Sequence, residues 1–420
     1  MLSLPPKRLT TMTNRKPPTT SEALARRQAS GPTPDQARAQ KLVLELMAIP
    51  GKSGEEAQIA TYIREKLLAA GAGPDAIVTD NANKHTLIGG NTGNLIFKLP
   101  GTLKGPRRML SAHMDTVPIC VGSQPRVEGM FVRSADPSTG LGGDDRAGAA
   151  TILTAAMKIL EDKLPHPPLT FCWFIQEEIG LFGARCVQKS VLGKPAVCFN
   201  WDGGPAYKLT IGATGGYRMA IEIDGLASHA GVHPECGISA IAIAALAIAD
   251  LQRDGWHGLI EKGKHRGTSN VGYIHGGEAT NVVTDRVTLK AEARSHDPKF
   301  RERIVAAIEK AFQNAAKEVR SDSGKQGSVR FDGRLDYESF RLPPQHACVQ
   351  LAEAAVTSVG HEPELAISNG GLDANWLNAH GIPTVTLGCG QMNIHTTSEQ
   401  LDLAAFRDAC QIALRLATTS

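Results

Sequence analysis

Residues 169–180 read LTFCWFIQEEIG, a run of apolar and aromatic residues that ends in two adjacent carboxylates. Such a run is typical of a strand that is buried on both faces of a sheet. A helical pattern precedes it at residues 146–162 (RAGAATILTAAMKILED), and a second strand-like run precedes that helix at residues 107–113 (RRMLSAH). The strand, helix, strand order predicts an α/β fold with a mainly parallel, helix-covered sheet.

The same alternation continues on both sides of this unit. Upstream, residues 35–49 and 55–70 carry apolar positions at helical spacing, and NLIFKLP (94–100) is strand-like. Helical and extended patterns resume from about residue 344 and end in a helical pattern over residues 398–417. We therefore expect that both ends of the chain contribute to one α/β domain.

The middle of the chain has a different pattern. Residues 214–227 (TGGYRMAIEIDGLA) alternate apolar and polar side chains and open a strand, helix, strand, strand, helix, strand order, with later segments at 237–252, 268–277, 281–297, 300–319 and 328–335. This order predicts a compact α+β insertion with one sheet face covered. We predict a split catalytic domain at residues 36–206 and 336–420, interrupted by a smaller lid at residues 207–335.

Composition agrees with a two-domain protein that acts on small molecules. A chain of 420 residues exceeds the size at which one core usually stops growing. The net charge of +3 and the scattered Lys and Arg residues give no basic stripe, so we expect no nucleic-acid partner. No run of about 18 apolar residues occurs, so we expect no membrane span. The eight cysteines form no CxxC pair, which predicts free thiols and a cytoplasmic location.

The first 35 residues differ from the rest, because they are rich in Pro, Ser, Thr and basic residues. They lack the continuous apolar core of a secretion signal. We expect a disordered tail. A transit segment, or a start-site artefact with Met12 as the true beginning, are the alternatives.

Acidic and histidine side chains follow several of the predicted strands. They are His113 and Asp115 in SAHMDTVP, Asp144 in GGDDRAG, Glu177 and Glu178 in IQEEIG, Asp202 in NWDGG, and His395 in NIHTT. Ligands bind beyond the carboxyl ends of the strands in parallel sheets, so we expect these side chains to converge. Imidazole nitrogens and carboxylate oxygens are ligands of zinc and similar divalent ions. The sequence therefore predicts a metal site at this edge of the sheet.

Single members of this set also have simpler interpretations. His113 is compatible with a strand cap, and Asp144 with the N-cap of the helix that follows, a part that Asp145 could take while Asp144 faces the site. The adjacent carboxylates of Glu177 and Glu178 are harder to explain in this way, since like charges side by side cost energy unless a cation or a proton relieves them. Taken together, the residues indicate a site more strongly than any one of them.

The five motifs, in this order, resemble the co-catalytic zinc metallopeptidase family that contains peptidase T (a tripeptide aminopeptidase), carboxypeptidase G and aminoacylase. The resemblance runs from about residue 38 to the C-terminus. With Asp202 followed by Gly-Gly, the chain is most similar to the peptidase T branch. The resemblance implies two divalent ions, Zn²⁺ by default with Co²⁺ or Mn²⁺ as alternatives, and a lid that can form a homodimer surface.

The resemblance also implies the metal ligands. His113 and Asp202 would bind one ion, and Glu178 and His395 would bind the other. Asp144 would bridge both ions.

Further roles follow from the same resemblance. Asp115 would orient the metal-binding histidine, and Glu177 would be the general base that activates a hydroxide bridging the two ions. In the lid, His229 would reach the substrate carbonyl, in many members from the partner subunit. Asn281 and Arg294 would bind the substrate backbone and terminal carboxylate, although an exposed salt bridge is an equal interpretation of Arg294.

We therefore expect a di-metal hydrolase of small peptides, either an aminopeptidase or a tripeptidase. An N-acyl amino acid amidohydrolase with the same mechanism is the alternative that the sequence leaves open. A third interpretation is an inactive metal-binding relative, against which the complete ligand set and Glu177 argue. The glycine clusters lack the Lys-Ser/Thr ending of a phosphate loop, which argues against a nucleotide-dependent enzyme.

Overall fold

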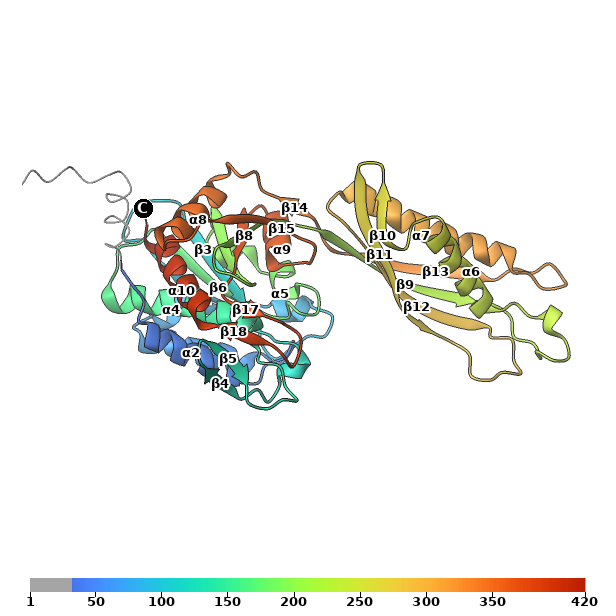
Figure 1. Cartoon of the computed structure of the whole chain (residues 1–420), viewed down its shortest axis with the longest axis horizontal. Helices are drawn as coiled ribbons and strands as arrows, with labels where there is room; N and C mark the ends of the chain where they lie inside the picture. Colours follow the sequence, from blue (N-terminus) through green and yellow to red (C-terminus); the bar gives the residue numbers. More distant parts are fainter. Residues whose placement is uncertain (1–31, 420) are drawn as a thin grey trace, which may run out of the picture.

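The computed structural model describes residues 32–419, so most of the segment 1–35, for which a tail was expected, lies outside the described residues. The chain forms two bodies joined by two neighbouring strand connections (Figure 1). Residues 32–213 and 340–419 build the large domain, and residues 215–337 build the lid. The predicted split domain with an inserted lid therefore describes the architecture.

A nine-stranded sheet forms the centre of the large domain. Its strands, in spatial order, are β1 (Ile77–Thr79), β2 (Leu95–Leu99), β6 (Leu169–Phe174), β3 (Arg108–His113), β7 (Val197–Trp201), β16 (Thr384–Leu387), β8 (Lys208–Ala213) and β14 (Phe340–Arg341), with β15 (Glu364–Ser368) beside β8. The central strands β6, β3, β7 and β16 are parallel, and antiparallel strands flank them. The predicted mainly parallel sheet is confirmed. Near its carboxyl edge, four short strands form a second sheet: β4 (Pro125–Glu128), β5 (Phe131–Ser134), β17 (Gln391–Met392) and β18 (Gln400–Asp402).

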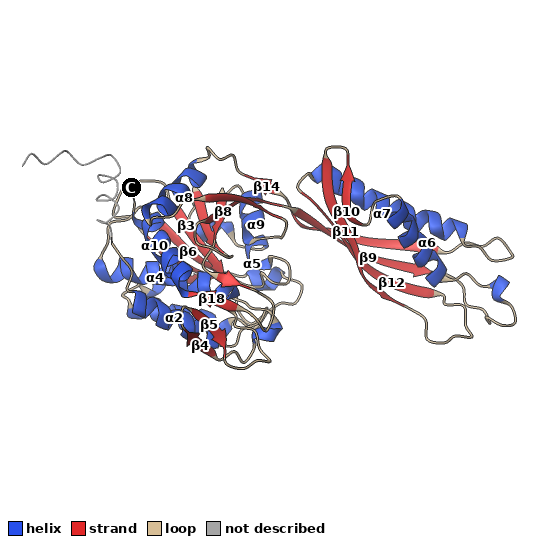
Figure 2. Cartoon of the chain, viewed as in Figure 1, coloured by secondary structure: helices blue, strands red, loops and turns tan. Residues whose placement is uncertain are grey.

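Helices cover both faces of the large sheet (Figure 2). They are α2 (Gln36–Ala48), α3 (Ala57–Ala69), α4 (Gly143–Asp162), α5 (Phe182–Arg185), α8 (Ala347–Ser358), α9 (Asp373–Ala379) and α10 (Leu403–Thr418). Successive side chains of β3 point to opposite faces, so Leu110 joins the core that includes α2, α4 and α10, while Met109 packs on the other side with Leu377 of α9. Burial on both faces explains why β6 (LTFCWF) is almost continuously apolar.

The lid is a five-stranded antiparallel sheet with two helices on one face (Figures 1 and 2). Its elements are β9 (Gly215–Asp224), α6 (Ala240–Arg253), β10 (Gly258–Lys262), β11 (His265–His275), β12 (Arg286–Ser295), α7 (Pro298–Glu318) and β13 (Ser328–Tyr337), with the strand order β10-β11-β12-β9-β13. The helices bury alternate sheet residues such as Ile221 and Leu289 against Ile304 and Phe312. The other sheet face carries no helix.

Three details of the predicted lid need correction. Strand β8 lies within the segment 207–335 but pairs in the large sheet, so the chain enters the lid after residue 213. Strand β10 was not predicted. Residues 281–285 do not belong to β12, because their backbone instead bonds to the lid loop before α6, as in Val283 N to Ser228 O at 2.9 Å and Ala230 N to Asn281 O at 2.9 Å.

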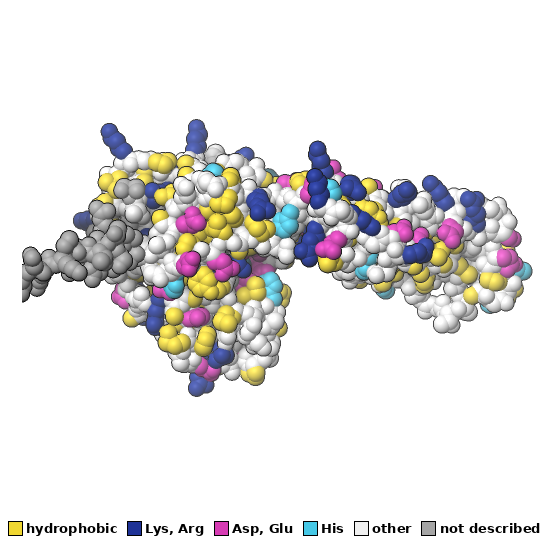
Figure 3. All heavy atoms as spheres, turned by 45° about the horizontal axis from the view of Figure 1, so that its top comes forward, with side chains coloured by type: hydrophobic (Ala, Val, Ile, Leu, Met, Phe, Trp, Pro, Cys, Tyr) yellow, Lys and Arg dark blue, Asp and Glu magenta, His cyan; other side chains and the backbone are white. Residues whose placement is uncertain are grey.

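On the face shown in Figure 3, Lys and Arg side chains are dispersed over both bodies and alternate with Asp and Glu. None of the described helices combines the length and apolarity needed to cross a lipid bilayer.

Candidate metal centre

The carboxyl edge of the large sheet brings the predicted residues together. His113 is the last residue of β3, Glu177 and Glu178 follow β6, and Asp202 follows β7, and these three strands are parallel neighbours. Asp144 lies at the start of α4, and His395 lies in the loop between β17 and β18.

Two groups of ligand atoms share Asp144. The first group is His113, Asp144 and Asp202, the second is Asp144, Glu178 and His395, and the ligand atoms within each group lie within 4.8 Å of one another. The Oδ1 atom of Asp144 lies 3.2 Å from Nε2 of His113, and its Oδ2 atom lies 3.2 Å from Nε2 of His395. Asp144 therefore presents one carboxylate oxygen to each group.

Asp115 connects His113 to the carboxylate loop after β6. Its Oδ1 atom lies 3.3 Å from Nδ1 of His113. The same carboxylate accepts hydrogen bonds from the backbone N–H of Glu177 at 2.9 Å and of Glu178 at 3.2 Å, and from Ser53 Oγ at 2.6 Å. Because Nδ1 faces Asp115, the Nε2 atom of His113 is directed toward Asp144. This arrangement fixes the orientation of a metal-binding imidazole.

Asp145, and not Asp144, caps the first turn of α4, a choice that the sequence alone did not decide. Its Oδ1 atom accepts a hydrogen bond from the backbone N–H of Gly148 at 2.9 Å, and its Oδ2 atom accepts one from the backbone N–H of His113 at 3.1 Å. The peptide bond between Asp144 and Asp145 is cis. Asp145 thus supports the first turn of α4 and the end of β3, while Asp144 faces the two histidines.

Two buried glutamates that sequence reasoning missed hold the loops of the site. Glu399 accepts hydrogen bonds from the backbone N–H of Gly142 at 2.7 Å and of Asp144 at 2.9 Å. Glu56 accepts hydrogen bonds from the backbone N–H of Gly54 at 2.8 Å and of Gln176 at 3.1 Å. Neither glutamate follows a predicted strand, so no pattern in the sequence distinguishes them from surface residues.

The electrostatics of the centre show an excess of buried negative charge. Burial, followed by repulsion from Asp144, raises the pKa of Asp202 to about 7. Burial also raises the pKa of Glu178 and raises that of Glu177 well above its usual range. Hydrogen bonds with Asp144 and Glu178 raise the pKa of His395 to about 10. Crowded carboxylates that must hold protons in the absence of a cation are a donor set that divalent ions fit.

The carboxylates of Glu177 and Glu178 differ in their contacts. Glu178 lies 2.9 Å from Nε2 of His395. Among the described residues, the Glu177 carboxylate accepts no hydrogen bond and forms no ion pair, and only its backbone is bonded. The two neighbours therefore have different surroundings.

The three predicted lid residues do not meet at this centre. His229 and Asn281 lie close together, since His229 forms an isolated bridge with Val282, in loops that follow β9 and precede β12. These loops are at the end of the lid farthest from the large domain (Figure 1). Arg294 lies at the opposite end, where it pairs with Gly216 at the start of β9. Both of its ion-pair hydrogen bonds, at 2.9 Å, go to Glu292.

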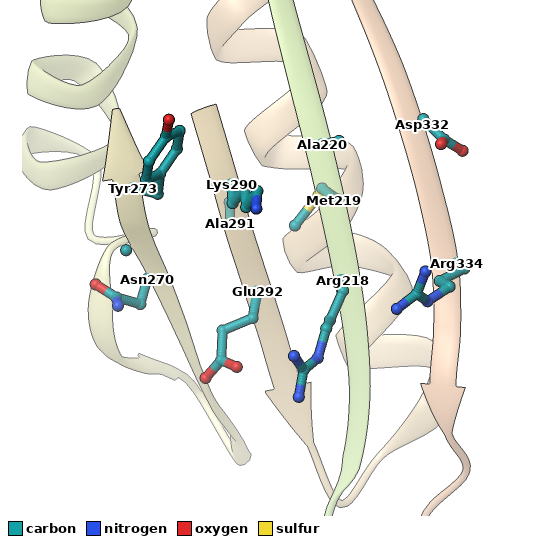
Figure 4. Close-up of a pocket in the computed structure, with 11 residues that line it drawn as sticks. Arg218, Met219, Ala220, Asn270, Tyr273, Lys290, Ala291, Glu292, Asp332 and Arg334 are labelled. Carbon is teal, nitrogen blue, oxygen red and sulfur yellow. The ribbon is translucent and has the colours of Figure 1, made fainter. Parts of the chain in front are cut away.

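A groove of about 530 Å³ lies on the helix-free face of the lid sheet (Figure 4). Arg218 and Arg334 are directly opposite each other on β9 and β13, and Figure 4 shows both guanidinium groups on this face. Arg218 bonds to Asp336 at 2.6 Å, whereas Arg334 has no hydrogen-bond or ion-pair partner among the described residues. Asp336 is near the centre, because a Cβ atom at Gly180, three residues after Glu177, would lie 3.4 Å from its Oδ1 atom.

The fold and the centre together define a class of protein. Histidine and carboxylate side chains converge at the carboxyl edge of an α/β sheet, and one further carboxylate stands free beside them. This is the arrangement of a metal-dependent hydrolase.

The chain belongs to peptidase family M20/M25/M40, whose sequence pattern matches residues 109–419. Its relatives include the uncharacterized protein YqjE of Bacillus subtilis (strain 168), with 34% identity over 86% of this chain and 92% of the relative. Peptidase T of Limosilactobacillus fermentum is 26% identical over 70% of this chain and 68% of that protein. The recognition of a peptidase T-like branch from the five motifs is confirmed.

Solved structures agree with this assignment. A tripeptidase from Staphylococcus aureus matches with a TM-score of 0.83 and 31% identity, over 92% of this chain and 99% of that one. Aminopeptidase PepT from Bacillus cereus matches with a TM-score of 0.80 and 32% identity, over 92% and 98%. A Bacillus subtilis protein described as a dinuclear metal binding peptidase shares the fold, with a TM-score of 0.66, 19% identity and coverage of 91% and 97%. The chain is a metal-dependent peptidase of this family.

Proposed function

We propose that this protein is a di-metal aminopeptidase of small peptides, tripeptides included. The observation that carries the proposal is the position of Asp144, whose two carboxylate oxygens each lie 3.2 Å from a histidine of a different ligand group. The similar structures from Staphylococcus aureus and Bacillus cereus, described as a tripeptidase and an aminopeptidase, support the substrate class.

In this proposal, His113 and Asp202 would hold one ion, Glu178 and His395 would hold the other, and Asp144 would contribute a carboxylate oxygen to each. Two imidazole nitrogens and three carboxylates suit Zn²⁺, and also Co²⁺ or Mn²⁺. Bound there, two divalent ions polarise a scissile carbonyl and lower the pKa of a water held between them.

The remaining carboxylate, Glu177, acts as the general base. It takes the proton of the attacking water and passes it to the leaving amine, since its neighbour Glu178 is occupied with His395. Asp115 is a positioning residue, because its carboxylate contacts His113 and the backbone of Glu177 and is fully buried.

The lid contributes substrate recognition in two places. Near the hinge, Arg294 binds the terminal carboxylate of the peptide, and the neighbouring groove with Arg218 and Arg334 adds positive charge on the same sheet face. At the far end, His229 and Asn281 belong to the loops that follow β9 and precede β12, which lie at the end of the lid farthest from the large domain (Figure 1), so we infer that they do not serve the centre of their own chain. We therefore propose a homodimer through the lid, in which His229 of the partner subunit reaches the substrate carbonyl.

A cytoplasmic location is part of the proposal. All eight cysteines are free thiols, and five of the seven that are not solvent-exposed lie in apolar cores.

The experiment that tests the proposal uses the full chain, stripped of metal and reloaded with Zn²⁺, Co²⁺ or Mn²⁺. Its substrates are di- and tripeptides with a free amino terminus, the same peptides with an acetylated amino terminus, and N-acetyl amino acids. We expect cleavage of free peptides from the amino end and little turnover of the acetylated ones. Exclusive deacylation of N-acetyl amino acids would show that the chain is an amidohydrolase instead.

A further inference from the structure

A second type of metal-binding cluster lies at the far end of the lid. In the part of the chain that the structure describes, three groups place one ligand atom per residue within 4.8 Å of one another. Two of these groups make up the centre that shares Asp144. The third consists of His233, Glu235 and Cys236, in and beside the short turn Pro234–Cys236 that follows β9.

The spacing of this third group fits a tetrahedral ion. The Nδ1 atom of His233 lies 3.3 Å from Oε1 of Glu235, and Sγ of Cys236 lies 3.7 Å from Oδ2 of Asp322. Zinc bound at about 2.0–2.3 Å by nitrogen, oxygen and sulfur places its ligands roughly 3.3–3.8 Å from one another. Asp322, in the loop between α7 and β13, is not a member of this group and lies beside it, next to the sulfur of Cys236.

The backbone holds these two segments together. The N–H of Asp322 donates a hydrogen bond to the carbonyl of Glu235 at 2.8 Å, and the N–H of Cys236 donates one to the carbonyl of His233 at 3.2 Å. The ligands are thus presented by bonded turns rather than by free side chains alone. Pro234, at the start of the turn, further restricts the backbone.

The charges of the cluster are not balanced within the protein. Among the described residues, neither Glu235 nor Asp322 forms an ion pair with a lysine or an arginine. Cys236 is an exposed cysteine, whereas the other cysteines are buried or, for Cys186, half-buried. Desolvation, together with the carboxylates of Asp322 and Glu235, raises the pKa of the Cys236 thiol. A cation would satisfy both carboxylates and the thiol.

We propose that His233, Glu235 and Cys236 bind one thiophilic divalent cation, zinc in the cell, separate from the two ions proposed for the catalytic centre, with solvent completing its coordination. On binding, the Sγ–H bond of Cys236 breaks, a sulfur–metal bond forms, and the proton passes to solvent. The site holds the His229 turn, because the backbone N–H groups of Val232 and His233 donate hydrogen bonds to the carbonyl of His229 at 3.2 Å and 3.0 Å. A bound cation therefore stabilises the turn that follows His229.

The test uses the ligand chemistry that distinguishes this site from the catalytic centre. The catalytic centre offers only nitrogen and oxygen, so a thiolate-to-metal charge-transfer band reports the lid site alone. The full chain, reduced and stripped of metal, is titrated with Cd²⁺ or Co²⁺ while the ultraviolet absorbance is recorded, and Zn²⁺ is then added as a competitor. The variants are Cys236→Ser, His233→Ala and, as a matched control for another accessible thiol, Cys186→Ser.

We expect a band whose final intensity corresponds to one thiolate-bound ion per chain, and which disappears in Cys236→Ser, persists in Cys186→Ser and is removed by Zn²⁺. His233→Ala should weaken the binding by about tenfold or more, since a ligand is lost. Elemental analysis of Cys236→Ser should still find the ions of the catalytic centre, which shows that this variant is folded. The absence of a band in the unmodified chain, a band that survives in Cys236→Ser, or an unchanged affinity in His233→Ala would each overturn the proposal.

Discussion

Replacing Glu177 by Gln tests the division of labour between the two adjacent glutamates. The substitution keeps the size and shape of the side chain but removes its ability to accept a proton. The contacts of Glu177 in the structure are made by its backbone, to Asp115 through N–H at 2.9 Å and to Gly180 and Leu181 through its carbonyl, and all of them survive the change. The loss should therefore fall on proton transfer and not on the architecture of the centre.

The magnitude follows from the role. General-base catalysis contributes a factor of about 10²–10⁴, which corresponds to about 3–5 kcal/mol of activation free energy. We expect Glu177→Gln to lower kcat on a tripeptide by that factor while KM changes little and both ions remain bound. The assay combines steady-state kinetics on the zinc-loaded chain with elemental analysis of the same sample.

Glu178→Gln is the matched control, one residue away. Its carboxylate lies 2.9 Å from Nε2 of His395 in a ligand group, so this variant should lose one of the two ions. If Glu177→Gln kept a near-normal kcat, the base assignment would be refuted. A loss of metal from Glu177→Gln would refute the ligand assignment of Glu178 instead.

Three further changes test other parts of the site. Asp144→Asn should lower the affinity for both ions, because each carboxylate oxygen faces a different group, and selective loss of one ion by elemental analysis would argue against a bridge. Burial and the nearby Asp115 raise the pKa of Glu56 from 4.5 to about 7, so the folded state keeps a proton that the unfolded state releases, and folding becomes less favourable as pH rises across that window. Glu56→Gln removes this dependence. The free energy of unfolding in urea of the variant, minus that of the unmodified chain, should therefore grow by roughly 3 kcal/mol between pH 4.5 and about 7 and then level off. A difference that stays constant with pH would contradict the raised pKa. Arg294→Lys should raise KM about tenfold for peptides with a free carboxyl terminus and spare their amides, because lysine lacks the bidentate geometry, and equal effects on both substrates would remove Arg294 from carboxylate binding.

The residues of the candidate metal centre could be predicted from the sequence because the fold places them by a simple rule. His113 ends a fully buried strand, Glu178 and Asp202 follow fully buried strands, and parallel strands end at one edge of the sheet. The pattern of strands in the sequence therefore predicts both the fold and the position of the site. His395, in a loop between two short strands, belongs to the predicted set because it lies in a polar loop after a predicted strand, and its role as a ligand comes from the resemblance of its motif.

The residues that support the centre could not be predicted in this way. Glu399 holds the backbone of Asp144, and Glu56 holds that of Gln176, from segments that are 255 and 120 residues away in sequence. A buried carboxylate of this kind is stable because backbone N–H groups from other segments surround it in the folded chain. Neither the periodicity of the sequence nor a local motif indicates where those N–H groups will lie. The same limit explains residues 281–285, whose β-branched composition suggests a strand although their backbone bonds to a loop.

The most direct test of the account is a crystal structure of the zinc-loaded chain with anomalous diffraction measured at the zinc absorption edge. The account predicts two peaks about 3.5–4 Å apart at the carboxyl edge of the large sheet, with one oxygen of Asp144 bound to each. A single peak there, or two peaks of which only one contacts Asp144, would contradict it.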